Sequence, residues 1–124
     1  MPPRGIAQSD WDAAKREGHA AMVAAVRSPA GAITYGELAT RITAIPFEAD
    51  SHNFHGLLGE ISQEENALGR GMLSVVVVHR SGEKRGQPGD GFFKLAQELG
   101  RDTHDRLRFW AAELEHVRRA WTRN

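Results

Sequence analysis

Residues 72–80 read MLSVVVVHR, and this stretch decides the fold that the sequence predicts. Four consecutive valines occupy positions 75–78, and β-branched side chains favour strands. A short apolar run of this kind is typical of a strand that is buried on both faces or lies in the centre of a small sheet. We therefore expect a strand at residues 72–79, followed by a glycine-rich basic loop at residues 81–91.

Helical periodicity surrounds this strand in the sequence. Apolar side chains recur every three or four residues in several segments, and a Ser, Thr or Asp precedes each of them as a candidate N-cap. The expected caps are Ser9, Thr34 (in a capping box with Glu37), Ser51 or Asp50, Asp90 and Thr103. The expected elements in chain order are a helix at 10–27, a short strand at 32–33, helices at 34–42 and 51–68, the strand at 72–79, and helices at 92–99 and 103–121.

This order of elements predicts a fold class. Two short helices followed by a strand and a basic loop are the parts of a winged helix-turn-helix, in which one helix enters the major groove and the wing touches the DNA backbone. We therefore expect an α+β domain, mostly helical with a small sheet. Its winged-helix-like core would span residues 31–100, extended by an N-terminal helix within residues 9–28 and a C-terminal helix at residues 103–121. A chain of 124 residues is expected to form one domain.

The composition excludes several classes of protein. Sixteen Lys and Arg balance sixteen Asp and Glu, which excludes a strongly basic nucleic-acid coat and a polyanionic tail, although a local basic patch stays compatible. Cysteine is absent, which removes disulfides, zinc–thiolate sites, iron–sulfur clusters and thiol nucleophiles. The first ten residues carry no apolar stretch, and the longest apolar run is too short to span a membrane. We therefore expect a cytoplasmic protein without a membrane partner.

Two segments of the chain resemble one protein family. Residues 31–39, GAITYGELA, resemble the motif that opens the DNA-binding domain of the alkylguanine-DNA alkyltransferases. Residues 66–80, NALGRGMLSVVVVHR, are similar to that family's N-x-L-x-x-x-P-x-x-x-P-C-H-R segment, and the resemblance continues through the basic loop to about residue 100. The resemblance implies a winged-helix DNA-binding domain.

The chain lacks the reactive group of that family. Val78 occupies the position of the nucleophilic cysteine, directly before His79-Arg80, and alkyl transfer needs a thiolate. The resemblance therefore implies an alkyltransferase-like, non-enzymatic DNA-binding protein. The base-flipping arginine of such proteins would fall where this chain has Gly56 or Leu57, so we do not expect base flipping by that side chain.

Basic and aromatic side chains are the expected nucleic-acid contacts. Arg80, Lys84 and Arg85 in the loop would neutralise phosphates. The resemblance implies that Tyr35 also contacts the DNA backbone, and the third helix would face the groove. We therefore predict a module that binds nucleic acid through these four residues and has no catalytic residue, no metal site and no cofactor.

The charge of the third helix supports an alternative. It carries Glu60, Glu64 and Glu65 and no Lys or Arg, and phosphates repel such a face. The alternative prediction is a protein–protein interaction or regulatory module that presents these three carboxylates to a partner.

The histidines leave a third class of function open. His52 and His55 stand three residues apart near a helix start and share a face, but two side chains do not complete a metal site. If two or more of His52, His55, His79 and His104 converge with Asp or Glu in a cleft, an uncharacterised His-dependent enzyme becomes the third alternative. Otherwise His79 is expected to order a hydrogen-bond network or to be capped by backbone.

Overall fold

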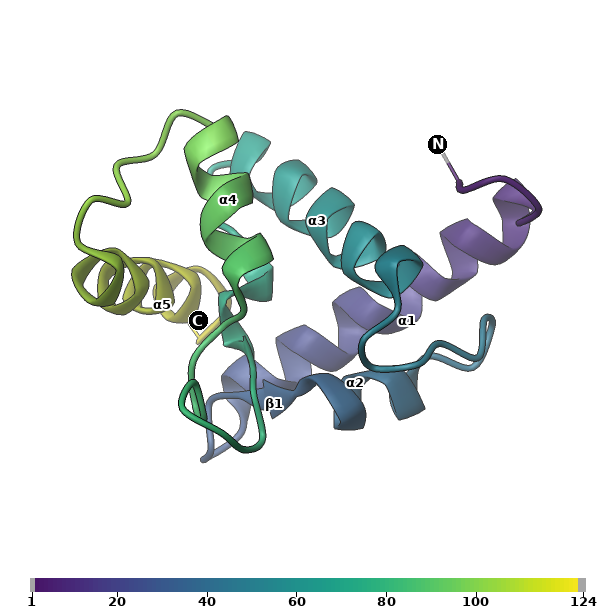
Figure 1. Ribbon diagram of the computed structural model, residues 1–124, viewed down its shortest axis with the longest axis horizontal. Coiled ribbons are helices and arrows are strands. Elements are labelled where there is room, and N and C mark those ends of the chain that lie inside the picture. The colour runs from purple at the N-terminus through teal and green to yellow at the C-terminus, as the bar shows by residue number, and fades with distance from the viewer. Residues whose placement is uncertain (1, 123–124) are drawn as a thin grey trace.

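The computed structural model describes residues 2–122 as a mostly helical protein around a very small sheet (Figure 1). In chain order the elements are α1 (Gln8–Arg27), β1 (Ile33–Thr34), α2 (Tyr35–Arg41), α3 (His52–Ala67), the 3₁₀-helix η1 (Leu73–Val76), β2 (Val77–Val78), α4 (Asp90–Glu98) and α5 (Arg106–Thr122). Within these residues the helices follow the predicted order, with ends that shift by a few positions. Across the same part of the chain, every helix is too short or too polar to cross a bilayer.

The sheet shows that the predicted winged helix-turn-helix fold is wrong. A winged helix carries a wing hairpin, whereas β1 and β2 have two residues each and pair in parallel. Ile33 pairs with Val77 and Thr34 pairs with Val78. Parallel neighbours cannot be joined by a tight turn, and here α2 and α3 lie between the two strands in the sequence.

The segment expected to form the wing is a loop at residues 79–89 (the 79–89 loop). It folds back on its own first residue, because the His79 N–H donates to the Gln87 carbonyl oxygen at 2.9 Å. The Gly86 N–H donates in turn to the His79 carbonyl oxygen at 2.9 Å. These bonds hold a compact loop against the end of β2 and form no hairpin strand within residues 2–122.

Helix packing explains why the valine run is not a strand of eight residues. Residues 72–78 are all buried, and the first part of the run, Leu73–Val76, turns as η1. η1 contacts α1, α3 and α5, so helices occupy the sides on which further strands would pair. Only Val77 and Val78 reach a strand partner. The apolar run therefore reflects burial among helices and not the interior of a sheet.

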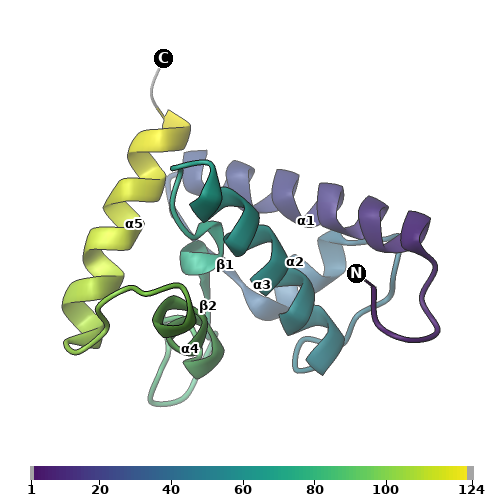
Figure 2. The same ribbon diagram turned by 90° about the horizontal axis from the view of Figure 1, so that it is seen from above.

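The core lies where α3 packs across α1 (Figure 2). Gly18 permits this close approach, because a Cβ added there would lie 3.3 Å from Ile42 Cδ1 and 3.5 Å from Ile61 Cδ1. The large side chains that are almost completely buried include Trp11, Met22, Leu38, Phe54, Leu57, Ile61, Met72 and Leu73. The helical periodicity of residues 51–68 predicts an inner face made of Phe54, Leu57, Leu58, Ile61 and Leu68. The first four are buried as predicted, whereas Leu68 is 62% exposed and the prediction there is wrong.

Two of the predicted helix caps are confirmed. The Glu37 N–H donates to Thr34 Oγ1 at 3.2 Å and the Thr34 N–H donates to Glu37 Oε1 at 3.1 Å, which is the expected capping box of α2. The Thr34 N–H and the Thr34 hydroxyl, which donates to the same Oε1 atom at 2.9 Å, hold the pKa of Glu37 below its usual value. Ser51 caps α3 by accepting the Phe54 N–H at 3.0 Å. The starts of α2 and α3 are therefore encoded locally.

Three other predicted caps are wrong. Ser9 lies inside α1, and Asp90 is the first residue of α4 without a capping bond of its side chain to that helix. Thr103 is buried before the start of α5, where its hydroxyl accepts a hydrogen bond from Gln97 Nε2 at 2.9 Å. Asp105 instead accepts a first-turn backbone N–H of α5 at 3.1 Å.

α5 closes one end of the molecule and packs less deeply than predicted (Figure 2). The helical periodicity of residues 103–121 predicts an inner face made of Leu107, Trp110, Ala111, Leu114, Val117 and Trp121. Glu113 and Val117 are the buried residues of α5 in the described chain, whereas Leu107 is 63% exposed. The Arg27 Nε of α1 donates to the Trp121 carbonyl oxygen at 2.7 Å, which joins the first and last helices.

Candidate functional site

The parallel pairing of β1 and β2 places two aromatic side chains next to each other. Because Thr34 pairs with Val78, the residues that follow, Tyr35 and His79, leave the sheet at the same end. Their ring centroids are 5.1 Å apart. The strand register therefore places the first two residues of the candidate site, Tyr35 and His79.

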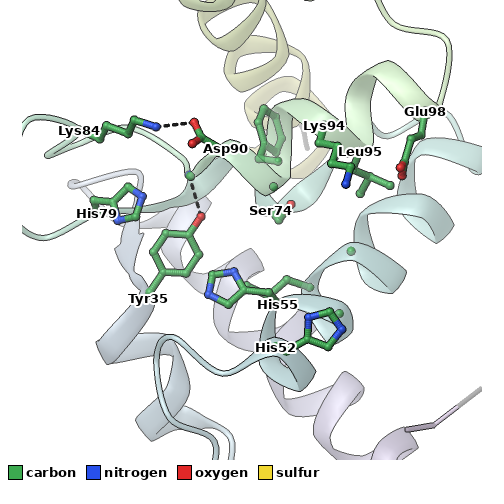
Figure 3. Close-up of a pocket in the computed structure, with 16 residues that line it drawn as sticks. Tyr35, His52, His55, Ser74, His79, Lys84, Asp90, Lys94, Leu95 and Glu98 are labelled. Carbon is green, nitrogen blue, oxygen red and sulfur yellow. Dashed lines mark hydrogen bonds and ion pairs between the residues drawn. The ribbon is translucent and has the colours of Figure 1, made fainter.

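Tyr35 lies close to a second imidazole and to the backbone of the 79–89 loop (Figure 3). His55, from the first turn of α3, has its ring centroid 5.0 Å from that of Tyr35. The Gly89 N–H donates to Tyr35 Oη at 2.9 Å. Burial raises the pKa of Tyr35 above its usual value and outweighs the opposite effect of the Gly89 hydrogen bond. The phenol therefore stays protonated at neutral pH.

A cavity of about 670 Å³ opens beside these rings, between α2, α3, α4 and the 79–89 loop. We call it the Tyr35 cavity. Its polar and charged lining residues are Tyr35, His52, His55, Ser74, His79, Lys84, Asp90, Lys94 and Glu98, and its apolar lining residues are Leu58, Phe92 and Leu95 (Figure 3). Its size, and its mixture of an apolar wall with a few polar groups, are typical of sites for small ligands.

A backbone carbonyl fixes the role of one nitrogen of His55. The Nε2 atom of His55 lies 3.0 Å from the Ala49 carbonyl oxygen, and a carbonyl only accepts, so Nε2 carries a hydrogen. The Nδ1 atom is the nitrogen that remains for a ligand. It accepts a hydrogen bond in the neutral ring and donates one in the protonated ring.

The fixed charges of the lining residues balance, and one further positive charge lies beside them. Lys84 forms an ion pair with Asp90, and Arg106 Nη1 of α5 donates to the same carboxylate at 2.9 Å. The hydrogen bond from Lys84 is the main reason that the pKa of Asp90 lies below its usual value. Lys94 and Glu98 of α4 contribute one exposed charge of each sign. The two lining lysines offset the two carboxylates, Arg106 adds one positive charge next to Asp90, and each protonated histidine would add one more.

Three of the four candidate histidines, His52, His55 and His79, line this one cavity, whereas His104 does not. Across residues 2–122, no group of three or more His, Asp or Glu side chains is arranged to hold a metal ion. The arrangement thus offers imidazole and phenol groups for hydrogen bonding.

The four predicted nucleic-acid contacts belong to one neighbourhood. Tyr35 and Lys84 line the cavity, and Arg80 and Arg85 are exposed on the loop that forms its wall. Neither guanidinium makes a hydrogen bond or an ion pair within the described chain. Both arginines are therefore available to an anion from outside the protein.

The three carboxylates predicted as a partner surface lie near basic side chains of the same chain. Lys15 of α1 lies 3.5 Å from Glu60 Oε1 and forms an ion pair with Glu64. Glu65 is only 3% exposed, and Arg70 Nε donates to its Oε1 atom at 2.9 Å. Much of the negative charge that α3 carries is therefore compensated inside the protein.

Sequence reasoning missed several residues of the cavity, among them Gly89 and Lys94. The only signal for Gly89 is its position after Pro88 and before a helix, which indicates a turn but not a contact. Lys94 follows two buried phenylalanines in a short helix, and nothing in the sequence relates it to residues of α2 or α3. Both assignments depend on how α4 packs in three dimensions.

Replacing Gly89 by alanine is expected to disturb the cavity and leave the fold intact. The added Cβ would lie 3.2 Å from His79 Nε2 and 3.3 Å from Tyr35 Oη, so both rings must shift by a few tenths of an ångström, whereas the φ angle of −75° suits alanine. We expect shifted NMR signals of the His79 and Tyr35 rings, with a change in unfolding free energy within about 1 kcal/mol. Gly91→Ala is the matched control, since its Cβ would meet nothing within 4 Å. Equal ring shifts in both variants would contradict this geometry.

Comparison of the chain with protein-family models, with curated proteins and with solved structures gives no match in any of the three. The resemblance of residues 31–39 and 66–80 to the alkyltransferases stays a prediction.

Proposed function

We propose that the chain is a non-catalytic module that binds nucleic acid through the 79–89 loop and the adjoining Tyr35 cavity. The observation that carries this proposal is the position of Arg80 and Arg85. Both are exposed and form no ion pair within 4.0 Å in residues 2–122, although Arg80 is near enough to Glu37 to contribute to the lowered pKa of that carboxyl. Their loop forms one wall of a cavity lined by Tyr35 and three histidines. Guanidinium groups bind phosphates, and aromatic rings stack on bases.

The resemblance to the alkyltransferases adds support to this proposal. Tyr35, His79 and Arg80 belong to the resembling segments, and Val78 stands in the place of the nucleophile. A protein that keeps these groups without a thiol has the means to bind nucleic acid but not to accept an alkyl group. A cytoplasmic location, expected from the sequence, is part of the same proposal.

The acidic half of α3 does not oppose binding in this arrangement. Its N-terminal turn brings His52 and His55 to the cavity, whereas its later carboxylates face Lys15 and Arg70. Phosphates would approach from the side of the loop. Since the carboxylates are engaged within the chain, the alternative of an acidic partner surface has less support than nucleic-acid binding.

Fluorescence anisotropy with short labelled duplex and single-stranded DNA, and with the matching RNA, tests this function across a salt series. We expect the logarithm of the association constant to fall linearly with the logarithm of the salt concentration, as counterions are released. In the variant Arg80→Ala/Arg85→Ala the slope on duplex DNA should decrease by about 0.9 for each phosphate contact that is lost.

The double variant Arg4→Ala/Arg16→Ala is the matched control. It removes the same charge from two exposed arginines that do not line the Tyr35 cavity. The control should bind almost as the parent protein does. No binding at low salt, or equal losses in the two double variants, would rule out the loop as a nucleic-acid contact.

A further inference from the structure

We infer that the Tyr35 cavity binds a phosphate monoester and that protonation of its histidines sets the affinity. The monoester is the phosphate of a free nucleotide or the phosphorylated end of a nucleic-acid strand. Binding of a strand end rests on the function proposed above, whereas binding of a free nucleotide does not depend on it. Internal phosphates of a strand would be left to Arg80 and Arg85 on the outer surface of the loop.

The charge of the cavity depends on its imidazoles. The ionisable groups that face the cavity are Tyr35 from α2, His52 and His55 from α3, His79 and Lys84 from the loop, and Asp90, Lys94 and Glu98 from α4. Arg106 of α5 adds a contact to Asp90 and so removes part of the repulsion that this carboxylate would exert on an anion. With neutral histidines the lysines and carboxylates cancel and the charge of Arg106 remains beside Asp90, and each imidazole that gains a proton adds one more positive charge. Histidine is the side chain whose charge changes between pH 5 and 8.

The hydrogen-bond donors of the cavity also depend on protonation. Since His55 Nε2 donates to the Ala49 carbonyl, its Nδ1 atom can donate to an anion only when the ring is protonated. Tyr35 adds a donor that does not depend on pH in this range. Its oxygen accepts the Gly89 N–H, and its own hydroxyl hydrogen has no acceptor within residues 2–122. Tyr35 therefore adds one constant donor to those of Lys84 and Lys94, and His55 adds one that is gained on protonation.

The shape of the cavity indicates more than an inorganic ion. A volume of about 670 Å³ exceeds what a phosphate group fills, and Leu58, Phe92 and Leu95 provide an apolar wall. Tyr35 and the imidazoles supply polar and aromatic surface on the other elements that line it (Figure 3). A nucleoside monophosphate joins a phosphate to an organic ring system. Such a ligand matches both the polar surface and the apolar wall of the cavity.

Protonation of the ligand and protonation of the cavity act on binding in opposite directions, which gives a distinctive pH dependence. A phosphate monoester carries about −1.5 to −2 charge at pH 7 and has its second pKa near 6. Protonation of an imidazole adds positive charge and strengthens binding of the anion, whereas protonation of the phosphate removes its second charge and weakens binding. We therefore expect the affinity to pass through a maximum between about pH 5 and 8.

The test is an NMR titration of the full chain, with the histidine ring signals as the readout. The probes are inorganic phosphate, adenosine 5′-monophosphate and guanosine 5′-monophosphate, with the two nucleosides as uncharged controls, at pH values from 5 to 8. At pH 6 we expect each monophosphate to bind at least about tenfold more tightly than its nucleoside, the size of one charge-assisted hydrogen bond. We expect the signals of His55 and His79 to shift and the signal of His104 to stay in place.

Variants separate the cavity from a general effect of charge. His55→Gln and His79→Gln should each weaken binding of the monophosphate and flatten its pH dependence, and His104→Gln should do neither. Tyr35→Phe keeps the ring and removes the hydroxyl donor, so it should weaken binding without changing the pH of maximal affinity. Circular dichroism melting verifies that each variant is folded.

A second set of three probes distinguishes the inference from the proposed function. These are short oligonucleotides of one sequence with a 5′-phosphate, a 3′-phosphate or no terminal phosphate. If the monophosphates bind and no oligonucleotide does at low salt, the inference stands for free nucleotides and the proposed function fails. If all oligonucleotides bind equally and the monophosphates do not shift the histidine signals, the proposed function stands and the inference is overturned. Equal affinity for nucleosides and monophosphates, or affinity that does not change with pH, also overturns it.

Discussion

Replacing Glu113 by leucine is expected to destabilise the protein by about 3 kcal/mol, because it leaves Arg101 without its counter-charge and the buried Met72 N–H without an acceptor. The side chain of Glu113 is 1% exposed and anchors α5 to two other segments. Its Oε1 atom accepts from Arg101 Nη2 at 2.6 Å, and its Oε2 atom accepts from the Met72 N–H at 2.7 Å. Since Arg101 is partly exposed, we place the loss at the lower end of the range for broken buried pairs.

Urea unfolding followed by circular dichroism measures this loss. Glu115→Leu on the same helix is the matched control, since Glu115 is exposed and pairs only with arginines of its own helix in the described chain. The control should change the unfolding free energy by about 0.5 kcal/mol or less. A Glu113→Leu protein as stable as the control would show that α5 is held by its apolar contacts alone.

Replacing Phe54 by alanine is expected to cost about 3–5 kcal/mol, the range for truncating a buried aromatic side chain. Phe54 is completely buried, and its ring centroid lies 5.4 Å from that of Phe47 and 5.7 Å from that of His55. The substitution should also loosen the start of α3, so that the His55 ring signal moves toward that of an unfolded chain before the global transition.

The matched control for Phe54 is Leu68→Ala at the other end of α3. Leu68 is 62% exposed, so its truncation should change the unfolding free energy by about 0.5 kcal/mol or less. Thermal melting and urea unfolding of the two variants give the comparison. Losses of similar size would contradict the placement of the core at the N-terminal half of α3.

The helices of this protein are encoded locally, and the sequence predicts them for that reason. The Thr34–Glu37 capping box and the Ser51 cap are short-range signals, and both appear in the structure as expected. The valine run at 75–78 misleads, because burial by helices and burial inside a sheet produce the same apolar string. Which of the two occurs depends on how α1, α3 and α5 pack, and no single segment carries that information.

The sequence names some residues of the candidate site but not their arrangement. It predicts Tyr35 and Lys84 as nucleic-acid contacts, and this role stays a prediction, although both residues line the cavity. The sequence identifies His52, His55 and His79 as separate candidate residues. That they line one cavity depends on a parallel strand pairing, which cannot be predicted from the sequence. Gly89 cannot be identified from the sequence, because its importance is that a side chain there would displace the rings of His79 and Tyr35.

The pairing of Ile33–Thr34 with Val77–Val78 also determines at which stage of folding the Tyr35 cavity forms. The two strands are far apart in the sequence, so their contact has a high entropic cost of chain closure and is expected to form after the local helices. In a partly folded chain α1 and α3 would already be formed, but the residues that line the Tyr35 cavity would not yet lie next to one another. Ligand affinity would then couple directly to completion of the fold, since only the fully paired chain can bind.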